Sequence, residues 1–323
     1  MLEKIDIVDF TLENGKLQKK ISLFYQVFGQ PIGTAPVVVV NHALTGNSNV
    51  TGKKGWWNEL IGENKTIDTN AYTVIAFNIP GNGFDGNDDN LIENYKDYSV
   101  TDVAKFFWKG LFYLKVDTVY ALIGGSLGGA IAWEMTKLEP NKVENLIPIA
   151  TGWKASDWLI GNVLIQDLIL NNSKKPIHDA RIHAMLLYRT PDSLQSKFGN
   201  SLQSETDKTF FKVESWLLHH GEKLQSRFQL SSYKLMNHLL KTTDVLKENT
   251  LEEFAKKIQS NIHLVSVDTD YFFTANEIRT CFTNLKKHKQ NVFYSQIQSI
   301  HGHDAFLIEF EQLNAILNPI FNK

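Results

Sequence analysis

The 323-residue sequence contains a single cysteine, Cys281, so no disulfide can form within the chain. It has no apolar run long enough to span a bilayer. Thirty-three basic and 35 acidic side chains leave a net charge of −2, which gives no electrostatic reason to expect a nucleic acid or a membrane as partner. The first six residues are charged and alternating, unlike a signal peptide. Together these absences predict a cytoplasmic protein.

The cysteine itself carries no sign of reactivity. Cys281 lies in a helix-like run, 276–289, with no tight turn around it, so we interpret it as a packing residue. The hydrophobic content of 43% and charged content of 21% are ordinary for a globular protein. A chain of this length can bury a large core.

A glycine-rich stretch around Ser126 is the most informative feature that is present. Gly124-Gly125-Ser126-Leu127-Gly128 follows a β-rich run and precedes a helix-like run, so it fits G-x-S-x-G, the nucleophile elbow of α/β-hydrolases. The turn would expose the serine oxygen and place the Leu127 N–H at a helix N-terminus, facing developing negative charge. Because glycine and serine are common in loops, the motif alone leaves an ordinary strand-to-helix turn open.

β-rich and helix-like runs alternate through the first half of the chain. Two runs joined by Asn14-Gly15 predict an antiparallel hairpin. The alternation after it predicts an α/β fold, with a mostly parallel central sheet and helices on both faces. The predicted strands are 5–12, 20–28, 37–40, 72–77, 116–123 and 143–150, and the predicted helices are 56–63, 99–114 and 130–138.

Residues 152–247 break this alternation, because their helical runs enclose no clear buried strand. We therefore predict a helical cap over residues 152–247, inserted into a core formed by residues 1–151 and 248–323. The predicted cap helices are 158–170, 177–188, 210–218 and 231–240. Beyond the cap we expect helices 251–258, 276–288 and 305–318 and strands 262–267 and 292–297.

Serine needs a histidine base and a carboxylate. In α/β-hydrolases the chain order is serine, then the carboxylate, then the histidine, and both partners lie in loops after late strands. Asp268 and Asp270 follow one late strand, and His301 and His303 follow the next. Spacing alone does not choose within either pair.

An oxyanion hole needs a second backbone N–H, from the loop after the third strand. His42-Ala43-Leu44-Thr45-Gly46 occupies that place, and we predict that Leu44 is the donor, together with Leu127.

Several of these stretches resemble the homoserine O-acetyltransferase family. The most specific are His42-Ala43-Leu44-Thr45-Gly46 and Gly302-His303-Asp304-Ala305-Phe306-Leu307, which accompany the elbow. The resemblance runs from about Val37 onward and includes the segments Ala180-Arg181-Ile182 to Tyr188, Ser193 to Gly199, Phe211 to Leu217 and Thr269 to Phe273.

The resemblance implies an α/β-hydrolase fold in which Asp270 and His303 are the partners of Ser126. It also implies a family with acyl-CoA as co-substrate, no bound cofactor or metal, and a homodimeric state.

By the same matching, Arg181 would bind a substrate carboxylate, Tyr188 would line the site, and Asp304 would hold a substrate ammonium. A guanidinium suits the first role because it is planar and can bind a carboxylate in bidentate fashion.

The chain departs from the family in two places. Residues 78–86 lack the family's cysteine and Ser/Thr-Gly-Pro pattern, and the segment between Gly152 and Arg181 is short and carries Trp153 and Trp158. Both regions would shape the acyl-CoA entrance and the acyl pocket.

The resemblance therefore implies an O-acyltransferase of methionine biosynthesis that converts acetyl-CoA and L-homoserine to O-acetyl-L-homoserine and CoA through an acyl-serine. A serine esterase with the same triad is the nearest alternative, and a non-catalytic binding protein is another. Succinyl-CoA as donor and L-serine as acceptor stay open.

Overall fold

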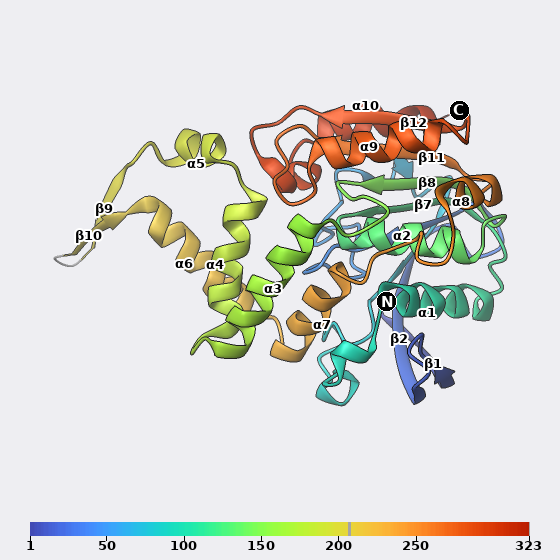
Figure 1. Cartoon of the computed structure of the whole chain (residues 1–323), viewed down its shortest axis with the longest axis horizontal. Coiled ribbons are helices and arrows are strands. Elements are labelled where there is room, and N and C mark those ends of the chain that lie inside the picture. Colours follow the sequence, from blue (N-terminus) through green and yellow to red (C-terminus); the bar gives the residue numbers. More distant parts are fainter. Residues whose placement is uncertain (206–207, 323) are drawn as a thin grey trace.

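The computed structural model describes residues 1–205 and 208–322 and has one central eight-stranded sheet, in the order β1-β2-β6-β3-β7-β8-β11-β12 (Figure 1). β1, β2 and β6 pair antiparallel, and every pair from β6 to β12 is parallel. The predicted mostly parallel sheet is confirmed. Its strands are β1 (Glu3–Thr11), β2 (Leu17–Gly29), β3 (Val37–Asn41), β6 (Thr73–Phe77), β7 (Val119–Gly125), β8 (Val143–Ile149), β11 (Asn261–Val267) and β12 (Val292–Ile297).

The central strands are buried on both faces, and every residue of β3 and β6 is buried. Apolar residues of α1, α2 and α9 pack on one face of the sheet, and those of α10 pack on the other with the 50–72 segment. The expected helices on both faces are confirmed. The bounds are α1 (Val100–Tyr113), α2 (Leu127–Leu138), α8 (Leu251–Lys257), α9 (Ala275–Lys286) and α10 (Phe310–Phe321).

The helix predicted over 56–63 is wrong. Residues 56–60 form turns, and β4 (Ile61–Gly62) then pairs with β5 (Ile67–Asp68). Trp57, Leu60 and Ile61 are all fully buried. The stretch lies between Gly55 and Gly62 and is too short for helix nucleation to be repaid.

The final helix starts later than predicted. Residues Gly302–Leu307 form a 3₁₀ turn, η3, and α10 begins only at Phe310. The Ser299 hydroxyl donates to the Glu309 carboxylate (2.6 Å), which holds the junction between the two elements. The turn leaves His303 and Asp304 outside the final helix.

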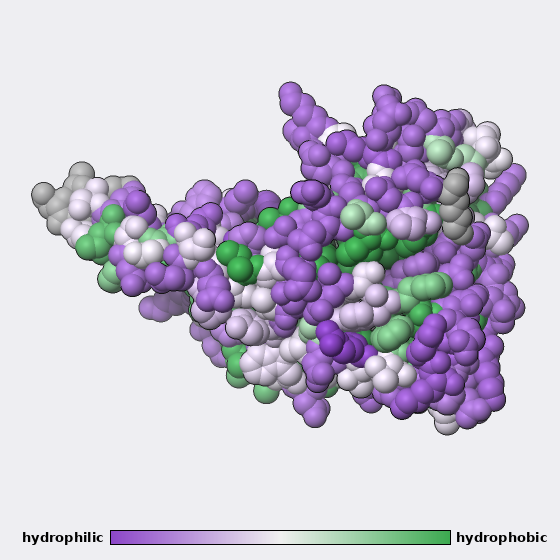
Figure 2. Space-filling model, turned by 90° about the horizontal axis from the view of Figure 1, so that it is seen from above, coloured by the Kyte–Doolittle hydropathy of each residue, from purple (hydrophilic) through white to green (hydrophobic). Residues whose placement is uncertain are grey.

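The segment between β8 and α8 carries α3 (Asp157–Asn172), α4 (Pro176–Tyr188), α5 (Pro191–Phe198), α6 (Lys212–Gln225) and α7 (Leu230–Leu240). It also forms a hairpin that was not predicted, β9 (Leu202–Glu205) with β10 (Lys208–Phe211), where we expected a helix from residue 210. The hairpin and α5 form an arm that extends from the sheet body (Figures 1 and 2). The arm exposes the apolar side chains of Leu202 and Phe211.

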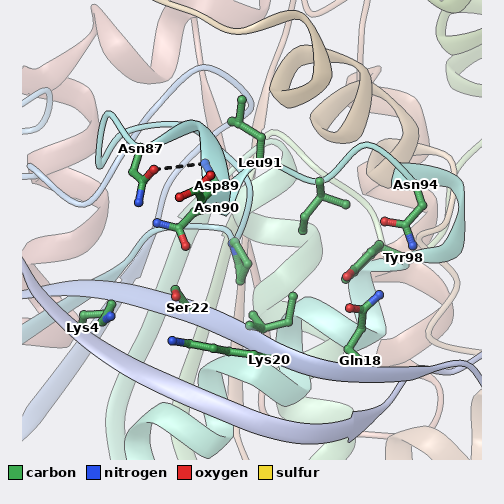
Figure 3. A pocket seen from close by; sticks show the side chains of 13 residues that line it. Lys4, Gln18, Lys20, Ser22, Asn87, Asp89, Asn90, Leu91, Asn94 and Tyr98 are labelled. Atoms are coloured by element: carbon green, nitrogen blue, oxygen red, sulfur yellow. Dashed lines mark hydrogen bonds between the residues drawn. The ribbon is translucent and has the colours of Figure 1, made fainter.

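A polar pocket of about 510 Å³ lies between the first hairpin and the 87–98 segment (Figure 3). Its lining comes from β1 and β2 on one side. On the other it comes from the short 3₁₀ turn η1 (Asp88–Asn90) with its neighbours, from Asn94 and Tyr98 next to the turn η2 (Tyr95–Asp97), and from Pro80. None of the described residues that line it is a predicted site residue. No helix of the described chain has the length and apolarity that crossing a bilayer requires.

An acid without a hydrogen bond is buried within α2. Glu134 is 1% exposed, its nearest cation is Lys137 Nζ at 3.7 Å, and neither carboxylate oxygen makes a hydrogen bond among the described residues. Burial raises the pKa of Glu134 to about 7. The folded pKa lies above the unfolded one, so folding is favoured at low pH. Stability is lost as pH rises from about 4.5 through 7.

We therefore expect Glu134→Gln to stabilise the fold at high pH. The free energy of unfolding should rise by about 2–3 kcal/mol at pH 8. At pH 5 it should rise by less than about 1 kcal/mol, because Glu134 is then almost fully protonated in the folded protein. Urea unfolding at both pH values measures this. The exposed Glu144→Gln is the control and should shift neither midpoint. An equal gain at both pH values would contradict ionisation as the cause.

Candidate active site

Ser126 lies between β7 and α2 in a strained conformation, with φ 54° and ψ −124°. Its N–H donates to the Ile149 carbonyl (2.9 Å), and its carbonyl accepts from the Gly129 N–H (2.9 Å). Such a conformation costs about 1–3 kcal/mol and persists only where the surroundings over-determine it. The turn has the geometry of a nucleophile elbow.

Two glycines of the elbow are required by close packing. A Cβ on Gly128 would lie 2.2 Å from the Asn41 carbonyl oxygen at the end of β3. A Cβ on Gly125 would lie 2.5 Å from the Phe306 ring. The elbow is therefore held between the loop after β3 and the turn η3.

Asp270 and His303 are joined by a hydrogen bond of 2.7 Å between Oδ2 and Nδ1. The other carboxylate oxygen, Oδ1, accepts from the backbone N–H groups of Phe272 (2.7 Å) and Phe273 (3.0 Å). Both side chains of the pair are buried. An ionised Asp270 oriented in this way keeps the His303 proton on Nδ1 and leaves Nε2 free to accept a proton.

Asp268 and His301, the alternatives to Asp270 and His303 in the two loops, make other hydrogen bonds. Asp268 Oδ1 accepts from the Ser299 N–H (2.9 Å). His301 Nδ1 lies 3.2 Å from Arg189 Nη2 and 3.0 Å from Ser193 Oγ. The structure thus brings Asp270 and His303 together and gives Asp268 and His301 other partners.

Aromatic rings enclose His303. Its ring centroid lies 5.2–5.7 Å from those of Tyr188, Phe272, Phe273 and Phe306. Phe306, whose ring packs against His303, also lies against the elbow at Gly125, so one aromatic side chain contacts both the base and the elbow. An apolar surround of this kind excludes water and strengthens the electrostatic interactions of the base.

The loop that carries Leu44 is fixed by a buried histidine. His42 Nδ1 donates to the Ala43 carbonyl (2.8 Å), and Nε2 accepts from the Ile79 N–H (3.0 Å), which ties the loop after β3 to the loop after β6. Burial lowers the pKa of His42 to about 4, so the ring is neutral at pH 7. Of the two predicted oxyanion-hole donors, Leu44 is buried in this loop, and Leu127 is the first residue of α2, directly after Ser126 in the chain.

We expect His42→Ala to slow acylation of Ser126 by about 10- to 100-fold, because the loop that presents the Leu44 amide loses its anchor. His42→Gln keeps an acceptor for the Ile79 N–H and should lose less than about fivefold. Stopped-flow acylation by p-nitrophenyl acetate measures both, at a temperature where each variant is folded. Equal rates for the two variants would contradict this account.

Arg181, Tyr188 and Asp304 meet beside His303. The Arg181 guanidinium lies over the Tyr188 ring, 5.6 Å from its centroid. Burial raises the pKa of Asp304, and the charges of Arg181, His303 and Arg189 oppose that rise. Arg181 makes no ion pair with any described carboxylate. The site therefore brings a cation, an anion and an aromatic ring together near His303.

Sequence reasoning missed three polar neighbours of this group. Arg189 lies 3.8 Å from Asp304, and Arg227 Nη1 donates to the Thr45 carbonyl (3.3 Å). Burial, with the charge of Arg181, lowers the pKa of His220 to about 4.

Cys281 is buried in α9, and burial raises the pKa of its thiol to about 12, in keeping with a packing role. In residues 1–205 and 208–322, no three His, Cys, Asp or Glu side chains come together as a metal site would require.

The family model of the α/β-hydrolase fold matches residues 36–205. The chain is 31% identical to the homoserine O-acetyltransferase of Methanosphaera stadtmanae, over 98% of this chain and 72% of that one. It is 32% identical to the homoserine O-acetyltransferase of Cyclobacterium marinum, over 96% of this chain and 92% of that one.

Solved structures share the architecture. The homoserine O-acetyltransferase of Staphylococcus aureus aligns with a TM-score of 0.84 at 24% identity, over 100% of this chain and 95% of that one. Esterase E22 aligns with a TM-score of 0.86 at 15% identity, over the whole of both chains. The expected α/β-hydrolase fold is confirmed.

Proposed function

Since the chain belongs to the homoserine O-acetyltransferase family of α/β-hydrolases, we propose that it transfers an acetyl group from acetyl-CoA to the hydroxyl of L-homoserine. The observation that carries the proposal is the buried Asp270–His303 pair, in a chain that also carries the strained Ser126 elbow. Acetyl-CoA is a co-substrate here and not a resident cofactor. The proposal places the enzyme in the cytoplasm, in methionine biosynthesis.

The reaction proceeds in two halves. In the first, His303 Nε2 takes the proton of Ser126 as Oγ attacks the thioester carbonyl, and the amides of Leu44 and Leu127 stabilise the oxyanion. The C–S bond then breaks, His303 returns the proton to the CoA sulfur, and acetyl-Ser126 remains. Asp270 orients His303 and stabilises its cation.

In the second half, the acceptor hydroxyl gives its proton to His303 and attacks the acetyl carbonyl. The bond to Ser126 Oγ breaks, and the proton passes to that oxygen. Arg181 binds the carboxylate of the amino acid and Asp304 its ammonium, while Tyr188 packs between them. The support for this pose is the Arg181 guanidinium over the Tyr188 ring and the electrostatic influence of Arg181 on Asp304.

A serine esterase uses the same acyl-enzyme but releases it to water. The test is CoA release from acetyl-CoA with and without L-homoserine, with L-serine as second acceptor and succinyl-CoA as second donor. We expect L-homoserine to stimulate CoA release and O-acetyl-L-homoserine to accumulate. CoA release that no amino-acid alcohol stimulates would favour the esterase. Ligand binding without an adduct on Ser126 would favour the binding protein.

We propose that residues 152–247 act as a cap on the site. In support, α4 supplies Arg181 and Tyr188 and contacts η3, the turn that carries His303 and Asp304, while α7 contacts α2 and η2.

We also propose a homodimer formed through α3. The exposed side chains of α3 occupy one continuous face, opposite its buried residues, and Leu164 is 59% exposed. The apolar members of this face are Trp158, Ile160, Leu164, Ile165 and Leu168.

Leu164→Asp should convert this dimer to a monomer, because a charge cannot be buried unpaired at the centre of an apolar interface. Light scattering coupled to size exclusion measures the mass. Leu17→Asp, at an equally exposed leucine of β2 (58%), is the matched control and should leave the dimer intact. A dimer that survives Leu164→Asp would contradict this interface.

A further inference from the structure

Arg189, the residue directly after α4, uses all three guanidinium nitrogens. Nε donates to Ser193 Oγ (3.1 Å), Nη2 donates to His301 Nδ1 (3.2 Å), and Nη1 lies 3.8 Å from Asp304 Oδ2. Ser193 Oγ also lies 3.0 Å from His301 Nδ1, which closes the network. The side chain is only 12% exposed. Hydrogen bonds at Nε and Nη2 fix the orientation of the planar guanidinium, and Nη1 is left within ion-pair distance of Asp304.

We propose that Arg189 is a positioning residue for the acceptor, because it holds the Asp304 carboxylate where it can receive the ammonium of the amino acid. The inference rests on the proposed function and adds a residue to it. Arg189 contacts Asp304 and not the substrate, so its effect passes through that carboxylate.

The charges around Asp304 show why such a residue is needed. The charge of Arg181 also acts on Asp304, yet the two form no ion pair among the described residues, so Arg181 stays available for the substrate carboxylate. Arg189 does form an ion pair with Asp304, at 3.8 Å. It therefore compensates the burial that disfavours the ionised carboxylate without engaging Arg181.

The position of Arg189 is set from two sides. The Thr190 hydroxyl donates to the Ile300 carbonyl, and Ser193 and His301 bind Arg189 itself. The network therefore joins the α4–α5 junction to the turn that carries both Asp304 and His303. For that reason the test must separate acceptor binding from the chemistry of His303.

The experiment compares L-homoserine with 4-hydroxybutyrate, which has the same hydroxyl and carboxylate but no ammonium. In the wild type kcat/KM should favour L-homoserine. In Arg189→Met the ratio of the two values should fall by about tenfold or more, the loss expected for one charge-assisted contact. Arg189→Lys keeps the charge and should recover most of the ratio. Acylation by p-nitrophenyl acetate, which needs no acceptor, should stay within about twofold in both variants.

The same substitution in an Asp304→Asn variant tests whether Arg189 acts through Asp304. In Asp304→Asn protein, Arg189→Met should not change the ratio further, because the carboxylate through which it acts is gone. A ratio that stays at the wild-type value in Arg189→Met, or that changes equally in the Asp304→Asn background, overturns this proposal alone. A fall in acylation as large as the fall in transfer also overturns it, in favour of a structural role. Absence of transfer by the wild type overturns the proposed function and, with it, this proposal.

Discussion

Ser126→Ala should abolish acetyl transfer, with kcat/KM for acetyl-CoA falling by at least about 10⁴-fold. The hydroxyl is the only group of the elbow that can carry the acetyl group between the two substrates. Alanine keeps the Cβ, so the strained backbone at φ 54° is unchanged and the fold should be retained. The loss of activity would therefore report the chemistry and not the stability.

Intact-mass spectrometry after incubation with acetyl-CoA provides the second measurement. The wild type should gain one acetyl group when no acceptor is present, and Ser126→Ala should gain none. Ser226→Ala, at an exposed serine of the inserted segment, is the control and should acylate normally. An adduct that persists in Ser126→Ala would place the nucleophile at another residue.

Asp270→Asn should cost about 10³- to 10⁴-fold in turnover, although the change is nearly isosteric. The two backbone N–H groups at Oδ1 fix how the asparagine sits, since they need its carbonyl oxygen as acceptor. The amide nitrogen must then face His303 Nδ1. That nitrogen can only donate, so the His303 proton moves to Nε2, and the ring loses its ability to take the proton of Ser126.

Asp268→Asn is a matched control for this substitution. Asp268 lies two residues away, and its carboxylate accepts from the Ser299 N–H in place of a histidine. We expect turnover within about fivefold of the wild type. If Asp268→Asn were as damaging as Asp270→Asn, the loss would reflect the loop as a whole and not the tautomer of His303.

The parts of the fold that depend on local sequence could be predicted. The all-apolar run at 37–40 indicates a buried strand, and the glycines around Ser126 indicate a tight turn. Both are present in the structure. The hairpin β9–β10 and the turns at 56–60 were missed. Their short runs carry little periodicity, and burial of Trp57 depends on distant partners such as the Phe306 carbonyl, to which its indole N–H donates (3.3 Å).

The candidate site shows the same division. The spacing of residues along the chain identified both late loops but did not distinguish Asp268 from Asp270. That choice depends on which carboxylate the backbone N–H groups of Phe272 and Phe273 hold toward His303. Arg189 was not predictable at all. Its partner His301 is 112 residues away along the chain, and no local pattern distinguishes Arg189 from a solvated helix-end charge.

The order of the strands has a consequence for how the protein reaches this state. β8 and β11 are neighbours in the sheet, yet residues 150–260 lie between them in the chain. Closing so long a loop costs about 4 kcal/mol in chain entropy before any pairing compensates for it. The inserted helices reduce that cost if they condense first, because they bring the two ends together. Parallel pairing of β11 with β8 is then a late event in folding. Asp270 and His303, the proposed partners of Ser126, lie after β11 in the chain, so they reach their places only after this pairing.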